Sequence, residues 1–195
     1  MPLIHTNANR VFEKFEKHMS DVVCGVLPLP PGFHLKLKWN NDSGTLEFLR
    51  GNYPAPVPVE TRLGKLFLAL NQDLTATREN LQYRLRTQRY KYQLLPSDDP
   101  RAEAIFRWEF KADMAPDVEC RNRLHINASL PVGHGTLEFK RTHIPTAYVL
   151  IEHVLRFLIH DLEVAPVTPD WPGLLRESET TFYEKFSGKR YRFRG

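Results

Sequence analysis

The chain has 195 residues, 42% of them hydrophobic and 26% charged, and a formal net charge of +4. This length predicts a single domain, and the apolar content can support a core, which excludes disorder over most of the chain. Two cysteines outside any CxxC pair exclude a disulfide framework, and no apolar run approaches the ~20 residues of a membrane helix, so we expect a cytoplasmic protein without a membrane partner.

The first half of the chain predicts a helix followed by a hairpin. Apolar side chains recur at helical spacing over residues 6–20, before a proline-rich break. Residues 33–49 predict a β-hairpin, because apolar and polar side chains alternate on both sides of a turn cluster of Asn, Asp, Ser and Gly. Residues 51–60 contain three prolines and predict an extended connector.

The region from 61 to 95 is ambiguous in its first part. Residues 61–80 fit a helix or a strand, and we favour a helix because four apolar side chains fall at helical spacing. Residues 81–86 either finish that helix or begin the next element. From 88 to 95, tyrosines and a leucine alternate with polar residues, which predicts a strand.

Three strands near 88–95, 104–111 and 122–130 predict an antiparallel meander. Residues 136–140 add one more short strand. The complete sheet is predicted to have about four to six strands.

A strong helix is predicted from Pro145 to residue 162, because proline is favoured at the first helical position and a stripe of apolar side chains follows. Glu152 is placed on its polar side. A last helix is predicted at 172–186, and the basic tail at 188–195 is expected to be flexible. The whole chain therefore predicts one α+β domain, with its sheet packed by an N-terminal helix and two C-terminal helices.

The candidate catalytic residues are Arg107, Glu109, His125 and Asn127. Alternation places the first two opposite a row of aromatic residues, and the last two opposite Leu and Ile. If the two strands pair, the four side chains share one surface at about 5 Å spacing. Glu109 would take the proton of a ribose 2′-hydroxyl, His125 would protonate the leaving oxygen, and Arg107 would stabilise the phosphate charge.

This set predicts RNA cleavage without a metal or other cofactor. The alternative is a polar sheet face with an ordinary Arg–Glu salt bridge. A second alternative is a metal-dependent hydrolase that uses His125, His134 and His143, although their spacing of nine residues matches no zinc motif. The chain has no GxGxxG, Walker A, GxSxG or HExxH sequence.

Cations and tyrosines are interleaved before the meander and again in the tail. Cations neutralise phosphates, and tyrosine rings offer faces on which unpaired bases stack. The residues expected to contact nucleic acid are Arg84, Arg86, Arg89, Tyr90, Lys91, Tyr92, Arg190 and Arg192. The alternative is that the tyrosines belong to the core and the arginines only solubilise the sheet.

The second half of the chain resembles a group of small bacterial proteins, some of which are similar to toxin components of toxin–antitoxin loci. The matching features are Tyr90, Tyr92, Phe106-Arg107-Trp108, His125-Ile126-Asn127, His143-Ile144-Pro145, the helix at 146–162, and Trp171 with Glu177-Ser178-Glu179. The resemblance implies a bacterial, RNA-directed toxin, although the chain lacks the dense histidine run that such toxins often carry. The expected partners are RNA and a protein, which is either an antitoxin or a subunit of a larger complex. The alternative to an RNA-cleaving enzyme is a non-catalytic interaction module or a subunit of a larger bacterial defence or toxin–antitoxin complex.

Overall fold

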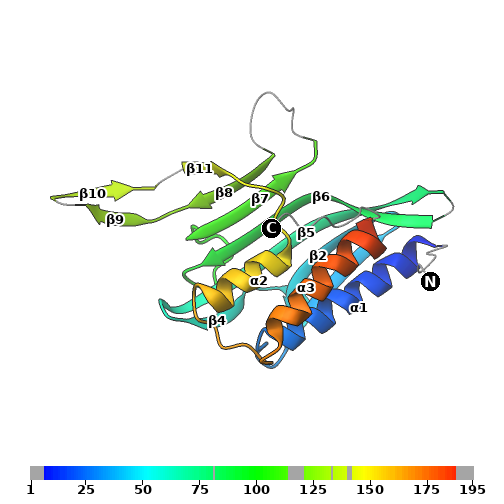
Figure 1. The fold of residues 1–195 in the computed structure, drawn as a ribbon, viewed down its shortest axis with the longest axis horizontal. Coiled ribbons are helices and arrows are strands. Elements are labelled where there is room, and N and C mark those ends of the chain that lie inside the picture. The colour runs from blue at the N-terminus through cyan, green and yellow to red at the C-terminus, as the bar shows by residue number, and fades with distance from the viewer. Residues whose placement is uncertain (1–6, 81, 114–120, 133, 140–141, 188–195) are drawn as a thin grey trace.

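Helices cover one side of a long sheet in the computed structural model, which describes residues 7–80, 82–113, 121–132, 134–139 and 142–187 (Figure 1). The helices are α1 (Ala8–Val26), α2 (Ile151–His160) and α3 (Trp171–Thr181), the last followed by a π-helical turn, η1 (Phe182–Ser187). We call the side of the sheet opposite the helices the open face. Within the described residues, no helix combines the length and the apolar run needed to cross a bilayer.

In the described part of the chain, the sheet has nine strands, and every neighbouring pair is antiparallel. The order is β1-β2-β5-β6-β7-β8-β11, with β3 beside β2 and β4 beside β5, and β9 and β10 form a separate hairpin. The bounds are β1 Phe33–Asn40, β2 Ser43–Arg50, β3 Tyr53–Pro54, β4 Val57–Thr61, β5 Gly64–Glu79, β6 Gln82–Leu95, β7 Phe106–Lys111, β8 Asn122–Ile126, β9 Ser129–Val132, β10 Gly135–Glu138 and β11 Thr142–Pro145. The predicted α+β class is confirmed, but the sheet is larger than the four to six strands expected.

The N-terminal helix and the first hairpin are also confirmed. The side chain of Asn7 caps α1 by accepting a hydrogen bond from the backbone N–H of Asn9 at 2.7 Å. The helix runs six residues beyond the predicted end at 20 and buries a stripe of apolar side chains. The hairpin β1–β2 turns at Asn41, whose φ of 53° suits asparagine.

Residues 61–80 are not a helix, and that prediction was wrong. They form most of β5, which pairs with β2 and β4 on one side and with β6 on the other. Leu66, Leu68 and Leu70 are buried in alternation with less buried neighbours. Their spacing fits a strand as well as a helix, and the three partner strands decide between the two. The connector at 51–60 likewise contributes β3 and most of β4.

The second helix begins later than predicted. Pro145 ends β11, where it lies opposite Arg123, and α2 starts only at Ile151. The prediction placed Glu152 on the polar side of this helix, and that placement was wrong. Glu152 is 1% exposed and lies at the contact with α3. Strand β8 also ends four residues before the predicted 130, because the chain leaves the main sheet to form the β9–β10 hairpin.

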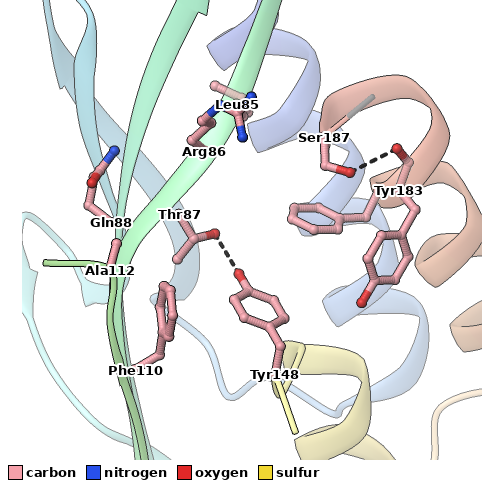
Figure 2. A pocket seen from close by; sticks show the side chains of 10 residues that line it. Leu85, Arg86, Thr87, Gln88, Phe110, Ala112, Tyr148, Tyr183 and Ser187 are labelled. Carbon is pink, nitrogen blue, oxygen red and sulfur yellow. Dashed lines mark hydrogen bonds between the residues drawn. The ribbon is translucent and has the colours of Figure 1, made fainter. Parts of the chain in front are cut away.

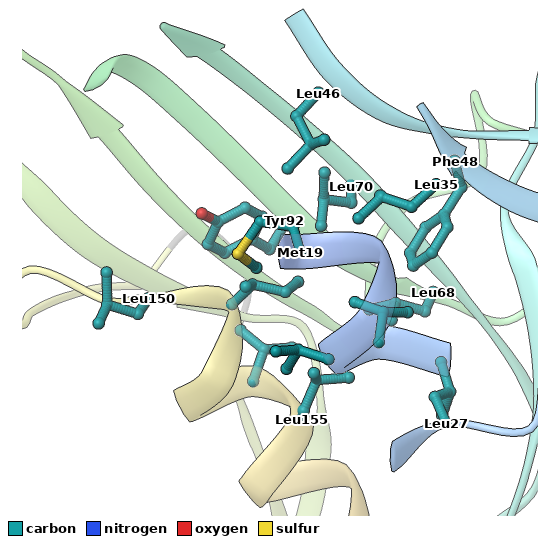
Figure 3. Close-up of a cluster of buried hydrophobic side chains, with 14 of the residues drawn as sticks. Met19, Leu27, Leu35, Leu46, Phe48, Leu68, Leu70, Tyr92, Leu150 and Leu155 are labelled. Atoms are coloured by element: carbon teal, nitrogen blue, oxygen red, sulfur yellow. The ribbon is translucent and has the colours of Figure 1, made fainter. Parts of the chain in front are cut away.

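The core lies between the helices and the inner face of the sheet. Figure 3 shows Met19 of α1 beside Tyr92 of the sheet, and Leu155 of α2 and Leu70 belong to the same cluster. All four are 5% exposed or less. One continuous core joins α1 and α2, which come from opposite halves of the chain.

Candidate functional site

Strands β7 and β8 bring three of the four predicted catalytic residues onto the open face. Arg107 lies directly opposite His125, and Glu109 lies opposite Arg123. The alternating aromatic residues point to the helix side, where Phe106 and Trp108 make edge-on contacts with Phe157 of α2. The aromatic row thus anchors β7 to a helix, and the ionisable residues are left on the opposite surface.

The four ionisable side chains form a contact cluster centred on Glu109. Its Oε2 atom lies 3.0 Å from His125 Nε2 and 3.2 Å from Arg123 Nε, and its Oε1 atom lies 3.0 Å from Arg107 Nε. Arg107 Nη2 closes the ring at 3.1 Å from His125 Nδ1. We call these four residues the Glu109 cluster. Its side chains are between 13% and 34% exposed, so the cluster is half-buried in the sheet surface.

The hydrogen-bond pattern assigns the tautomer of His125. A guanidinium nitrogen can only donate, so Nδ1 accepts from Arg107. Nε2 then carries the hydrogen and donates it to Glu109. In this arrangement the ring is neutral and both nitrogens are engaged within the cluster. A proton transfer to a ligand would therefore require one of these two contacts to open.

The charge on Glu109 is stabilised by its neighbours. Burial by itself raises the pKa of this carboxyl, but the surrounding Arg107, His125 and Arg123 outweigh burial and lower it. Glu109 is thus held ionised at neutral pH. The Nε atom of Arg107 is buried and, in the described part of the chain, makes no well-directed hydrogen bond despite its short distance to Glu109.

Asn127 does not join the cluster. It lies just beyond the end of β8, where its backbone N–H donates to the carbonyl of Ile105 at 2.9 Å. Its side chain makes no hydrogen bond to any described residue. Arg123 takes the fourth position instead. Because Arg123 is two residues before His125, the alternation of β8 puts both side chains on one face. The prediction instead chose Asn127, two residues after His125.

Cross-strand rows of polar residues extend from the Glu109 cluster over the neighbouring strands. One row runs Asn71–Lys91–Glu109–Arg123, and a second runs Asp73–Arg89–Lys111. We call these two rows the basic rows. Together with Arg107 they carry five cations and two carboxylates, namely Arg89, Lys91, Arg107, Lys111, Arg123, Asp73 and Glu109.

Two hollows follow the basic rows. One has a volume of about 220 Å³ and is lined by residues that include Arg89, Lys91, Glu109 and Lys111. The other, of about 570 Å³, also includes Arg89 and continues toward β1 and β2. Arg89 is ion-paired with Asp73 at 2.6 Å, whereas Lys91 and Lys111 have no carboxylate within ion-pair distance among the described residues. Among the described cations of the basic rows, these two lysines are the ones without an ion pair.

Tyr90 and Tyr92 cannot stack on bases, so their expected role is corrected. Both point to the helix side and are 1% exposed, with their rings stacked on each other at 4.6 Å. The Tyr90 hydroxyl accepts from the backbone N–H of Val149, and the Tyr92 hydroxyl donates to Gln72 Oε1 at 3.2 Å. The alternative interpretation, in which the tyrosines belong to the core, is the one that the structure bears out.

The remaining predicted nucleic-acid contacts are spread more widely. Arg84 donates to the backbone carbonyls of Glu184 and Lys185 in η1, each at 3.3 Å, and so ties β6 to the last turn of the chain. Arg86 is ion-paired with Glu79. Arg190 and Arg192, with the rest of the predicted flexible tail, lie outside the described residues.

The three-histidine metal site remains a prediction. His143 lies opposite His125 across β8 and β11, but its side chain is outside what the structure describes. His134 is exposed at the turn between β9 and β10. In the described part of the chain, no three His, Cys, Asp or Glu side chains gather to hold a metal ion.

No protein-family model, curated protein or solved structure matches this chain. The resemblance to bacterial toxin components therefore stays a prediction. The open face, with the Glu109 cluster and the basic rows, is the candidate functional surface.

Proposed function

We propose that the protein binds single-stranded RNA along the open face of its sheet. The observation that carries this proposal is the pair Lys91 and Lys111, which lie beside Arg89 in a hollow and have no anionic partner among the described residues. Cations in such a groove release counterions when they neutralise phosphates, and this drives binding to any polynucleotide backbone. An excess of positive charge in the basic rows supports the same polyanionic ligand.

The proposed binding is dominated by the backbone of the RNA. The tyrosines that would have stacked on bases are buried, and the two hollows are lined mainly by charged and polar side chains of the sheet. Binding through phosphates alone carries little sequence information. We therefore expect a strong dependence on salt and a weak dependence on base sequence.

Fluorescence anisotropy of a labelled single-stranded RNA, measured over a range of salt concentrations, tests this proposal. The double variant Lys91→Ala/Lys111→Ala should reduce the slope of log affinity against log salt by about 2, roughly one for each phosphate that is no longer neutralised. The matched control is Arg10→Ala/Lys14→Ala, which removes two exposed cations from α1 on the helix side. Equal reductions in both double variants would mean that the open face is not the binding surface.

The second candidate function is RNA cleavage by the Glu109 cluster. The contact between Glu109, His125 and Arg107 favours it, because the carboxylate that lines the smaller hollow also touches an imidazole and a guanidinium. A phosphate could take over the Arg107 donor and so release His125 Nδ1. With the ring then protonated, Glu109 would accept the 2′-hydroxyl proton, the 2′-oxygen would bond to phosphorus, and the departing 5′-oxygen would take its proton from His125.

Geometry places binding ahead of cleavage. In-line displacement puts the attacking and departing oxygens on opposite sides of the phosphorus, whereas Glu109 and His125 touch each other at 3.0 Å. The cluster as it stands can serve one of the two proton transfers, so cleavage requires the pair to separate. Incubation with labelled RNA between pH 5 and 9 decides this: a 2′,3′-cyclic phosphate product that Glu109→Gln and His125→Ala abolish supports cleavage, and intact RNA refutes it. Binding without cleavage would suit a non-catalytic subunit of a larger complex.

A further inference from the structure

A cavity of about 520 Å³ lies on the helix side of the sheet, between β6, the end of β7 and the turn η1 (Figure 2). Its size is within the range of small-molecule sites. Neither RNA binding on the open face nor cleavage by the Glu109 cluster uses this cavity. Aromatic side chains form much of its wall, namely Phe110, Tyr148, Phe182 and Tyr183.

The cavity exists because β7 is shorter than β6. In the described part of the chain, the two strands pair between Arg89 and Leu94 on β6, and beyond Arg89 the backbone N–H of Ala112 donates to Gln88 O at 2.8 Å. The register between β5 and β6 shifts at this point and leaves Gln88 without a paired residue on β5. Beyond Gln88, side chains of Tyr148 and η1 face β6 from the helix side and line the cavity.

The wall of the cavity offers hydrogen bonds from uncharged groups. The Tyr148 hydroxyl donates to Thr87 Oγ1 at 2.6 Å, as Figure 2 shows, and Gln72 Nε2 donates to the same oxygen at 3.1 Å. The Thr87 hydroxyl hydrogen then remains to be donated, and the Tyr148 oxygen can still accept. Burial raises the pKa of Tyr148, so this hydroxyl stays neutral at physiological pH.

The described lining favours an uncharged ligand. Among the described residues that line the cavity, the one charged side chain is that of Arg86, and it is already paired with Glu79. A flat, uncharged ring with hydrogen-bonding groups on its edge matches both the aromatic walls and the hydroxyls. Among the parts of an RNA chain, a base has this chemistry.

The cavity is also connected to the open face. Gln88 lines both this cavity and the 570 Å³ hollow that contains Arg89. Among the described residues, no strand pairs with Leu85–Gln88 on the β7 side of β6, so a chain that follows the basic rows meets an edge of the described sheet here. A nucleotide at this edge can turn its base toward the helix side while its phosphate stays near Arg89.

We propose that this cavity receives one unpaired base of the RNA whose phosphates lie on the open face. The proposal rests on the proposed function and adds a base-reading site to a surface that otherwise binds the backbone. Stacking of a base between aromatic side chains typically strengthens binding by about tenfold. The cavity thus gives a reason for a preference for single-stranded RNA, because a base within a duplex is not free to turn out of its stack.

The test uses two single-stranded RNA oligonucleotides that differ at one internal position. One carries the fluorescent base 2-aminopurine there, and the other carries an abasic site. We expect the protein to quench the 2-aminopurine emission and to bind the abasic oligonucleotide about tenfold more weakly. Ala112→Trp, which fills the cavity from its wall, should remove both effects, whereas Ala102→Trp, in a turn away from the cavity, should preserve them.

The outcomes separate the two proposals. If neither oligonucleotide binds, the proposed function is wrong and the base site falls with it. If both bind with equal affinity and without quenching, the open face binds RNA and the base site is refuted. Should circular dichroism show that Ala112→Trp is unfolded, Tyr183→Leu provides a second variant, and retention of full quenching there would overturn the proposal. A free nucleoside that restores the emission while the oligonucleotide stays bound would support it.

Discussion

The Nε2 atom of His125 and the Oε2 atom of Glu109 lie 3.0 Å apart across the β7–β8 pair, and Arg107 holds the other side of the imidazole at 3.1 Å. The histidine thus lies between a carboxylate and a guanidinium that are themselves an ion pair. This arrangement makes Glu109 the residue on which the local surface depends, since Arg107, Arg123 and His125 all lie within 3.2 Å of its two oxygens.

Glu109→Gln should destabilise the protein by about 1–3 kcal/mol at pH 7, because it leaves half-buried cations without their carboxylate. The pKa of Glu109 is lowered in the folded state, so its ionised form contributes stability above its unfolded pKa, and this contribution is lost as the pH falls through the folded pKa. Urea unfolding at pH 7 and pH 3 should therefore show a difference between wild type and variant that shrinks in acid. The exposed control, Glu60→Gln, should behave as wild type at both values.

Asp73→Asn should strengthen RNA binding, in the opposite direction to the lysine variants. Asp73 accepts from Arg89 at 2.6 Å and from Thr45 at 2.8 Å, and asparagine can keep the second bond while it releases the Arg89 cation. We expect a several-fold gain in affinity and a salt slope steeper by about 1. Asp98→Asn changes the net charge equally but lies in an exposed turn, so a similar gain there would point to net charge alone.

Tyr92→Phe should lower stability by about 1 kcal/mol and leave RNA affinity unchanged. Its hydroxyl donates to Gln72 within the core, and its removal leaves the amide oxygen of Gln72 without this donor. For a chain of this length the melting temperature should fall by about 2–4 °C. A drop in RNA affinity with unchanged stability would contradict the buried position of the ring.

Glu152→Gln should stabilise the protein at pH 8. Burial raises the pKa of Glu152 to about 7, despite the hydrogen bond that Ser178 donates to it. A raised folded pKa means that stability is fully present below the unfolded pKa and falls as the pH rises toward 7. The decrease is on the order of 3 kcal/mol, at about 1.4 kcal/mol for each unit of pKa. Thermal melts at pH 5 and pH 8 should show that the variant loses less stability than wild type over this range.

The groups that face Glu152 determine whether the pH dependence can be assigned to Glu152 alone. Arg156 lies on α2 with Glu152, and Tyr148 lies just before this helix. Ser178 and Glu179 lie on α3, and Tyr92 lies on β6. Of the charged neighbours, Glu179 is paired with Arg156 at 2.7 Å, so its charge is compensated over the same pH range. If the variant and wild type melt in parallel at both values, Glu152 does not titrate in this range.

The alternation of apolar and polar residues correctly predicted which face of a strand a side chain occupies. It did not distinguish the long strand β5 from a helix. Arg107 and Glu109 were placed correctly opposite the aromatic row, because a strand with period 2 leaves no other choice. The segment at 61–80 failed because its leucines satisfy periods of both 2 and 3.6, and only the contacts with β2, β4 and β6 favour the strand. Those contacts join residues far apart in the sequence.

The direction of the tyrosines shows a different limit. Their alternation with Arg89 and Lys91 was evident, but it does not say which side the helices cover. Pairing decides this, since Tyr92 lies opposite Trp108 and shares its buried face. The late start of α2 has a similar origin: Pro145 suits a helix start, yet its position opposite Arg123 ends a strand.

The long hairpin β5–β6 also bears on how the chain folds. Its strands adjoin in sequence and pair over thirteen positions, from Phe67 and Leu95 to Glu79 and Gln82. Contacts between neighbours in the chain close early, because little loop entropy opposes them. We therefore expect this hairpin to be the nucleus onto which the later strands assemble, and its central amides to be the last to exchange their hydrogens with solvent.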